Sequence, residues 1–219
     1  MTPGCPSLSE LADALSQYGA ICHQLHSSPD FADLQAVESA FTAADERLGG
    51  ADGIVVAVGG RQSTRPRPLV SMSESDWRQD LVDPLRTTRH CLQAACRALS
   101  GRPARIVLLG PNVSLTGATG FTALVALSEA QRSLMKSAAR QWGARGIYLN
   151  WLGLDPAVFA RDLETASFAA TPEMGEPPPA LGSAPELSAG VAATIASMIG
   201  PHAVTGASIP VDGGQWMVP

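Results

Sequence analysis

Residues 105–136 read RIVLLGPNVSLTGATGFTALVALSEAQRSLMK, and this stretch decides the fold. Its beginning, 104–110, is a short apolar and partly β-branched run, which is typical of a buried strand in a parallel sheet. The glycines that follow predict a turn. Small and apolar residues at helical spacing then predict a helix over 122–142. A strand, a turn and a helix in this order form one unit of an α/β fold.

The same alternation continues on both sides of this unit. Buried strands are predicted at 53–60, 104–110, 146–153 and 207–214, with a weaker one at 19–26. Helices are predicted at 7–19, 27–50, 73–101, 122–142 and 186–200. The first should end at Gly19, and the second should begin with Ser28 as N-cap and Pro29 at its first position and end at Gly49. This order predicts a doubly wound parallel sheet with right-handed crossovers.

The composition suits one domain over 1–219, since 45% of the 219 residues are hydrophobic. Within it, 161–186 contains five prolines and is expected to be an irregular loop or a lid over a cleft. A net charge of −5 without a basic run gives no support to nucleic-acid binding. We expect a cytoplasmic protein with free thiols and no membrane contact, because the sequence shows neither a signal peptide nor a membrane-spanning stretch.

Four segments occur in the order and at the spacing of a known enzyme family. They are the strand–turn–helix of 105–142, GARGIYLN at 143–150, VTGASIPVDGG at 204–214, and ESDW followed by a long helix at 74–99. From about residue 7 onward the chain resembles the short-chain dehydrogenase/reductase family. The resemblance implies a Rossmann-like doubly wound parallel sheet, truncated at the N-terminal dinucleotide-binding unit, because the family's T-G-x-x-x-G-x-G turn has no counterpart here.

The family's catalytic positions carry the wrong groups for its hydride chemistry. The family uses a serine, a tyrosine, a lysine four residues after the tyrosine, and an upstream asparagine. A tyrosine phenol is of little use at neutral pH without a neighbouring cation. In this chain the four positions hold Pro111, Leu124, Ser128 and Pro84. The only lysine, Lys136, is expected to be a solvated helix residue.

The cofactor positions are also altered. The family's N-N-A-G segment, which closes over the cofactor, corresponds to Val56-Ala57-Val58-Gly59. We therefore predict no catalytic, cofactor-binding or metal-binding residue in this chain, and NAD(P) only in a partner subunit. The four histidines, His23, His26, His90 and His202, lack the spacing of metal ligands.

A second interpretation keeps an active cleft. Asn112, Ser114, Ser128 and Glu129 would line a pocket at the former reaction centre. Glu129 would then act as the base of a cofactor-independent cyclase, dehydratase or isomerase. The simpler expectation is that Glu129 faces solvent and Ser128 packs at an interface. A ligand-binding regulator that uses the same cleft is a third possibility.

The helices that the family uses for assembly are retained. Ala123, Ala126, Ala130 and Ser133 form a small-residue stripe on the helix 122–142, near Leu127 and Leu134. In the resembled family this helix and the long helix before it form a four-helix interface, and a second interface surrounds the last strand. In the tail Gln215–Pro219, two expectations stay open: Trp216 and Met217 contact a neighbouring subunit, or the tail is a frayed terminus.

This combination resembles the inactive small subunits of two heteromeric pairs in the family. One is the ketoreductase pair of aminocoumarin assembly, and the other is the dehydrogenase pair of anaerobic toluene breakdown. The sequence therefore predicts a non-catalytic structural subunit of an NAD(P)-dependent oxidoreductase. It would form a heterotetramer with a catalytically intact homologue and act on a β-hydroxyacyl or β-ketoacyl thioester in a biosynthetic or degradative pathway.

Overall fold

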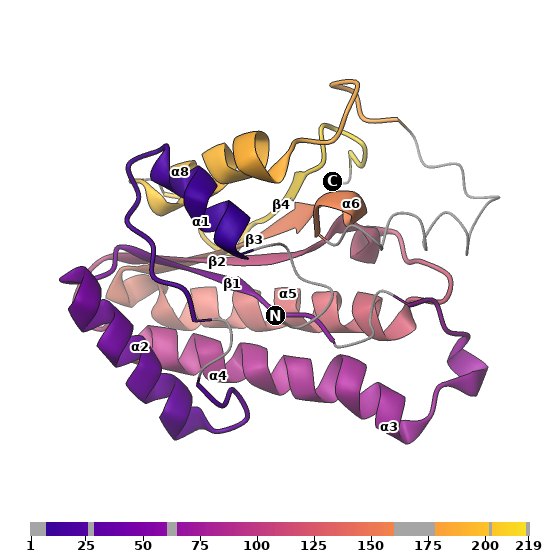
Figure 1. The fold of residues 1–219 in the computed structure, drawn as a ribbon, viewed down its shortest axis with the longest axis horizontal. Helices are drawn as coiled ribbons and strands as arrows, with labels where there is room; N and C mark the ends of the chain where they lie inside the picture. Colours follow the sequence, from indigo (N-terminus) through magenta and orange to yellow (C-terminus); the bar gives the residue numbers. More distant parts are fainter. Residues whose placement is uncertain (1–7, 26–28, 61–64, 160–177, 202, 218–219) are drawn as a thin grey trace.

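One sheet of four parallel strands, in the order β1-β2-β3-β4, forms the centre of the molecule (Figure 1). The structure is a computed structural model and describes residues 8–25, 29–60, 65–159, 178–201 and 203–217. The strands are β1 (Gly53–Ala57), β2 (Ala104–Pro111), β3 (Ile147–Leu154) and β4 (Ser208–Val211). The predicted doubly wound parallel sheet is therefore confirmed.

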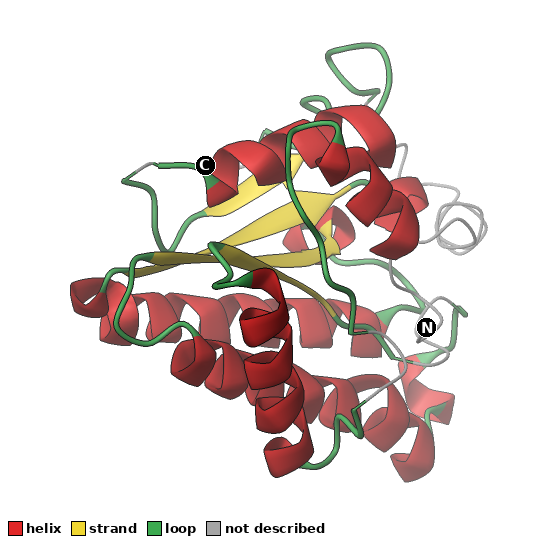
Figure 2. Ribbon diagram, turned by 60° about the vertical axis from the view of Figure 1, so that its left-hand side comes forward, coloured by secondary structure: helices red, strands yellow, loops and turns green. Residues whose placement is uncertain are grey.

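Helices cover both faces of the sheet (Figures 1 and 2). α1 (Leu8–Ser16) and α8 (Ala192–Ile199) lie on one side, which we call the α8 face. α2 (Leu34–Leu48), α4 (Asp83–Ala98) and α5 (Thr122–Trp142) lie on the other side, the α4 face. Shorter helical segments are η1 (Leu69–Ser71), α3 (Glu74–Trp77), η2 (Arg78–Val82), η3 (Asn112–Leu115), η4 (Gly143–Arg145), α6 (Pro156–Phe159) and η5 (Leu187–Val191).

The central strand β2 supplies both halves of the core. Ile106 and Leu108 point to the α4 face, whereas Val107 and Leu109 point to the α8 face, and all four are almost completely buried. Side chains alternate between faces along a strand, so a strand covered on both sides needs a continuous apolar run. Each such side chain contributes roughly 1.5–3 kcal/mol by its burial. This is the physical basis of the pattern that made 104–110 recognisable.

The predicted strand at 19–26 is wrong for its described residues. Ala20–Leu25, which we call the strap, belong to no sheet, and His26 lies outside the described residues. Gly19 has a φ of 81° and ends the turn after α1, as expected for a glycine at this position. An apolar pattern indicates which side chains are buried in the fold. A strand also needs a neighbouring strand that forms hydrogen bonds with its backbone N–H and C=O groups.

The predicted start of α2 is also wrong. The N-cap is Asp33, whose carboxylate accepts a hydrogen bond from the backbone N–H of Gln35 at 2.9 Å. Asp30 holds the turn before it, because its carboxylate accepts the backbone N–H of Ala32 at 3.0 Å. Pro29 therefore lies in the connection, and Ser28 lies outside the described residues. The predicted end at Gly49 is confirmed by its left-handed φ of 70°.

The long predicted helix 73–101 contains a π turn. α3, η2 and α4 are continuous, and the backbone N–H of Asp83 donates to the carbonyl oxygen of Arg78, five residues earlier. Pro84 follows directly. Proline has no N–H to donate and its ring crowds the carbonyl one turn before it, so the helix widens by one residue instead of breaking. Gly60 packs against this turn: a Cβ there would lie 2.6 Å from the Cα of Asp80.

Part of the predicted loop or lid contacts the C-terminal turn. Residues 161–177 lie outside the described residues, but the segment after them packs against the turn that follows β4. The backbone N–H of Leu181 donates to the carbonyl oxygen of Gly213 at 2.9 Å. A Cβ on Gly213, whose φ is 71°, would lie 2.6 Å from the carbonyl oxygen of Ser183. This close approach explains why a glycine is needed there.

Asp45 fixes the connection between α2 and β1. Its carboxylate accepts the backbone N–H of Ala51 at 2.6 Å and forms an ion pair with Arg102. Desolvation by burial acts to raise the pKa of Asp45, but these hydrogen bonds and the charge of Arg102 outweigh it and hold the pKa below its usual value.

We expect Asp45→Asn to lower the free energy of unfolding by about 1 kcal/mol at pH 7, measured by urea titration. A depressed folded-state pKa stabilises the protein above the unfolded pKa, and this stabilisation is lost as the pH falls through the folded-state value. The difference between the two proteins should therefore shrink below about pH 4. Asp13→Asn, at an exposed position of α1, is the control. A difference that does not change with pH would contradict this assignment.

Candidate functional site

The four positions that the sequence resemblance assigns to the family's catalytic residues lie in the interior of the structure. Pro111 ends β2, Leu124 and Ser128 are one turn apart on α5, and Pro84 is the second residue of α4. All four are buried, with Leu124 and Ser128 each 1% exposed. Leu124 belongs to the apolar cluster of the α8 face, so the position that the resemblance assigns to the family's tyrosine holds a core side chain.

Trp151 fills the space on the α4 face beside the end of β2. Its side chain is 0% exposed and lies against two glycines, Gly110 of β2 and Gly153 of β3. A Cβ on Gly110 would lie 2.8 Å from the indole Nε1, and a Cβ on Gly153 would lie 2.6 Å from the indole Cζ3. The two glycines therefore make the room that the indole occupies. The guanidinium of Arg132 lies 5.3 Å from the ring centroid, within cation–π range.

A buried polar pair joins the end of β2 to the C-terminal turn. Asn112, 0% exposed, donates from Nδ2 to the carboxylate of Asp212 at 2.9 Å. The same carboxylate, 1% exposed, accepts the backbone N–H groups of Gly214 at 3.0 Å, Gln215 at 3.3 Å and Trp216 at 3.3 Å. Four donors converge on one carboxylate, which anchors the tail to the edge of the sheet.

Gln131 of α5 ties down the segment that follows β1. Its side-chain amide, 3% exposed, donates to the carbonyl oxygen of Val58 at 3.0 Å and to the hydroxyl of Thr88 at 2.9 Å. Thr88 in turn donates to the carbonyl oxygen of Pro84 at 3.0 Å. This chain of hydrogen bonds holds Val58, α4 and α5 together in the segment that the resemblance assigns to the family's cofactor-closing loop.

The residues of the second interpretation are not brought together as an acid–base site. Asn112 bonds Asp212, as described above. Glu129 forms two hydrogen bonds with Arg132, at 2.6 and 2.8 Å, and its side chain is 44% exposed. Arg132 also donates to the hydroxyl of Ser208 at 3.2 Å. Glu129 is thus a partly solvent-exposed carboxylate held by a cation on its own helix, which agrees with the simpler expectation.

Ser114 and Ser128 are buried as well. No hydrogen-bond partner of either hydroxyl lies among the described residues, and the same holds for the Oδ1 atom of Asn112. Burying such a group without a partner costs free energy, so these three atoms are a local destabilising feature of the interior. Both serines face the interior rather than Glu129.

The histidines and cysteines show no nucleophilic or metal-binding arrangement in the described ranges. His90 is buried: its Nε2 accepts from Arg89 at 2.9 Å, which leaves Nδ1 to donate to the carbonyl oxygen of Phe31 at 3.0 Å. Burial raises the pKa of Cys91 to about 12, so its thiol stays protonated. His23 is exposed on the strap, and His26 and His202 lie outside the described residues. No group of three potential metal ligands occurs among the residues described.

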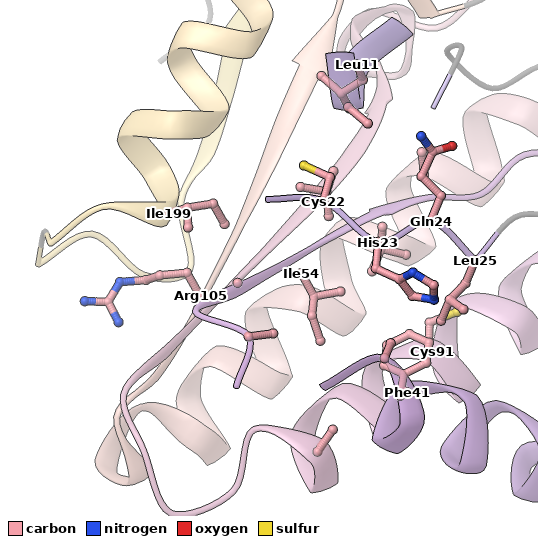
Figure 3. Close-up of a pocket in the computed structure, with 18 of the residues that line it drawn as sticks. Leu11, Cys22, His23, Gln24, Leu25, Phe41, Ile54, Cys91, Arg105 and Ile199 are labelled. Atoms are coloured by element: carbon pink, nitrogen blue, oxygen red, sulfur yellow. The ribbon is translucent and has the colours of Figure 1, made fainter. Parts of the chain in front are cut away.

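A cavity of about 1260 Å³ runs along β1 (Figure 3). Leu11 of α1 and Ile199 of α8 line it from one face of the sheet, and Phe41 of α2 and Cys91 of α4 line it from the other. Residues of the strap also line the cavity. The cavity therefore surrounds the outer edge of β1 instead of lying at Leu124 and Ser128.

The side chains present do not fit the nicotinamide end of a dinucleotide. Pro84, Pro111 and Leu124 carry no side-chain donor or acceptor, and Ser128 has a short hydroxyl where a long cation is needed. Val56 and Val58 present apolar side chains to the α4-face core, and the carbonyl of Val58 is already bonded by Gln131. The prediction that this chain holds no cofactor agrees with this donor set and remains a prediction.

Sequence reasoning missed Trp151, Gln131 and Asp212. Trp151 is part of a predicted strand, and the two glycines that receive it are its only signal in the sequence. Gln131 is a polar residue on the buried side of a helix, a pattern that indicates a hydrogen-bonded network. The partner of Asp212 lies a hundred residues away, so nothing local announces the pair.

Lys136 is exposed on α5, as predicted.

Within the described ranges, every helix is too short or too polar to cross a bilayer.

Comparisons with known proteins agree with this architecture. A sequence profile described as "Enoyl-(Acyl carrier protein) reductase" matches residues 7–215. The 3-oxoacyl-[acyl-carrier-protein] reductase of Vibrio cholerae serotype O1 is 26% identical over 197 residues, which are 84% of this chain and 74% of that protein. The corresponding reductase of Pseudomonas aeruginosa is 28% identical over 172 residues, which are 74% of this chain and 66% of that protein.

Solved structures show the same relationship. A dehydrogenase/reductase from Sinorhizobium meliloti 1021 has a TM-score of 0.71 at 28% identity, with 91% of this chain and 77% of that chain covered. A short-chain dehydrogenase from Burkholderia cenocepacia J2315, solved in complex with NADP, has a TM-score of 0.66 at 26% identity, with 86% and 75% covered.

Proposed function

Because this chain belongs to the short-chain dehydrogenase/reductase family of oxidoreductases, we propose that it is a non-catalytic structural subunit of a heteromeric NAD(P)-dependent member. Two copies would pair with two copies of a catalytically intact homologue. The homologue would hold NAD(P) and perform the hydride transfer, and this chain would complete the assembly.

One observation carries the proposal: Leu124 is 1% exposed and packs in the α8-face core with Leu109, Phe121 and Leu154. A phenol cannot be supplied from this position, and replacement by leucine has made the position part of the core. Ser128, one turn further along α5, has no cation to offer. General acid catalysis needs a group whose pKa suits the working pH, and neither side chain provides one.

The surface supports a subunit role. On α5, Ala123 of the predicted stripe is buried, whereas Ala126 and Ala130 are half-buried and Ser133 is exposed, so part of the small-residue stripe remains accessible to another helix. Near the C-terminal turn, Leu181 and Met217 are each 79% exposed. A Cβ on Gly214 would lie 3.1 Å from the Cβ of Ala180 and 3.5 Å from the Cε of Met217, which places the two segments side by side. Apolar surface of this kind is typical of association sites.

The relatives suggest the substrate class of the complex. Both curated relatives are 3-oxoacyl-[acyl-carrier-protein] reductases. We therefore infer that the intact homologue acts on a β-ketoacyl or β-hydroxyacyl thioester.

Co-expression with a catalytically intact family member from the same genome tests the assembly. We expect a tag on this chain to co-purify that homologue in equal amounts, with the mass of a heterotetramer by light scattering. Ala130→Arg should abolish co-purification, because a long charged side chain prevents the close approach of a second helix. Lys136→Arg, on the same helix but exposed, should not. Recovery of this chain as a monomer during co-expression would contradict the proposal.

A fluorescence titration with NADPH tests which subunit binds the cofactor. The isolated chain should show a Kd above about 1 mM, the weak end of the range in which enzymes hold their substrates, whereas the complex should bind in the micromolar range. Tight binding by the isolated chain would assign the cofactor site to it and refute a purely structural role.

A further inference from the structure

The outer edge of β1 is unpaired among the described residues. The backbone N–H of Arg105 donates to the carbonyl oxygen of Asp52 at 3.1 Å, so residue 52 faces β2. Backbone groups alternate in direction along a strand, which turns Ile54 and Val56 to β2 as well. The N–H and C=O groups of Gly53, Val55 and Ala57 then point to the open side. No backbone hydrogen bond from that side reaches them in the described part of the chain.

The strap has the side-chain pattern of a strand. In Figure 3, Cys22 and Gln24 point to the side of Leu11, whereas His23 and Leu25 point to the side of Phe41 and Cys91. Such alternation is the period of two that a strand shows. The strap and residues 53–59 line the same cavity, and no backbone hydrogen bond joins the two.

The connection between the strap and β1 is that of a βαβ unit. The strap is followed by α2, which covers the α4 face, and then by β1. A strand, a crossover helix and a second strand in one sheet run parallel. Both ends of the strap are held: Ala20 N–H donates to the carbonyl oxygen of Leu15 at 3.2 Å, and beyond the strap Phe31 is bonded by His90.

We propose that the strap docks along β1 as a fifth parallel strand and closes the cavity. In a parallel sheet, all residues whose side chains lie on the same face turn their backbone N–H and C=O groups toward the same side of their strand. Ile54 and Val56 lie on the α4 face and turn their backbone to β2. A strap that runs parallel therefore turns Ile21, His23 and Leu25 toward β1, and Cys22 and Gln24 away from it.

The strap is favoured over a separate peptide or a second copy by its tether. A segment held through a short connection has an effective concentration in the millimolar range, which a free partner reaches only at high concentration. Docking also covers apolar surface. Ile21 is 86% exposed in the undocked arrangement, and in the docked one it lies on the α4 face beside Ile54. The unpaired edge, which would otherwise invite association with another chain, is removed at the same time.

Amide hydrogen exchange of the full chain, resolved by NMR, tests the proposal. We expect the amides of Val55 and Ala57 to be protected in the native protein. His23→Pro removes an N–H that faces β1 and should speed their exchange about tenfold. The matched control, Gln24→Pro, removes an N–H that faces solvent and should change the exchange less than about twofold.

Three outcomes would overturn the docked strap. The first is exchange of Val55 and Ala57 at unprotected rates in the native chain, a measurement that needs no variant to fold. The second is an equal effect of the two proline variants. The third is protection that rises with protein concentration, which would assign the edge to a second copy of the chain.

Discussion

Trp151→Ala is expected to lower the free energy of unfolding by about 4 kcal/mol, measured by urea titration. The indole is fully buried between β2, β3 and α5, and two glycines shape the space around it. Alanine would leave a large cavity that the sheet cannot close, because Gly110 and Gly153 have no side chains to move into it. The cation–π contact with Arg132 would be lost as well.

The matched controls follow from the same packing. Trp151→Phe keeps most of the apolar volume and should cost less than half as much. Gly110→Ala should destabilise the natural protein, since its Cβ would meet the indole at 2.8 Å, but should be nearly neutral in a Trp151→Leu background. Additive effects of Gly110→Ala and Trp151→Leu would show that the glycine has another role.

Asp212→Leu is expected to cost about 3 kcal/mol by the same measurement. Leucine has nearly the shape of aspartate but no acceptor. The Nδ2 group of Asn112 and the backbone N–H groups of Gly214, Gln215 and Trp216 would lose their shared partner.

Asp212→Asn keeps one oxygen and turns an NH₂ group toward one of the donors, so an intermediate loss is expected. The tail should loosen in both variants, and fluorescence of Trp216 should report it as greater exposure to a quencher. A loss of less than about 0.5 kcal/mol for Asp212→Leu would mean that water replaces the carboxylate at little cost.

The sheet was predictable because each buried strand is a short, continuous apolar run in the sequence. β2 and β3 are covered on both faces, so nearly every residue in them is apolar, and the predicted and observed bounds almost coincide. α5 was equally clear over Thr122–Trp142. Pro111 lies at the end of β2, and Leu124 and Ser128 lie on α5, as expected from their fixed distances within one strand–turn–helix unit.

The errors have a common origin in partners that lie far away in sequence. The strap carries strand-like residues, but whether it pairs depends on the edge of β1 and not on its own pattern. The start of α2 depended on which of several possible residues caps the helix. The carboxylate of Asp33 is the cap, and that of Asp30 holds the turn before it. Trp151 and Asp212 could be placed on their elements, but Gly110 and Asn112, which give them a structural role, become neighbours only when the chain folds.

The π turn at Arg78–Val82 makes the start of the long helix sensitive to length in an unusual way. One residue in a helix corresponds to roughly 100° of rotation and 1.5 Å of rise. Losing a residue here would therefore rotate Glu74–Trp77 by more than a quarter turn about the helix axis, while it would shorten the helix only slightly. Insertions and deletions in this segment change the direction in which Trp77 points. A gap at this place in an alignment of relatives therefore indicates that the first turn of the helix is rotated about the helix axis.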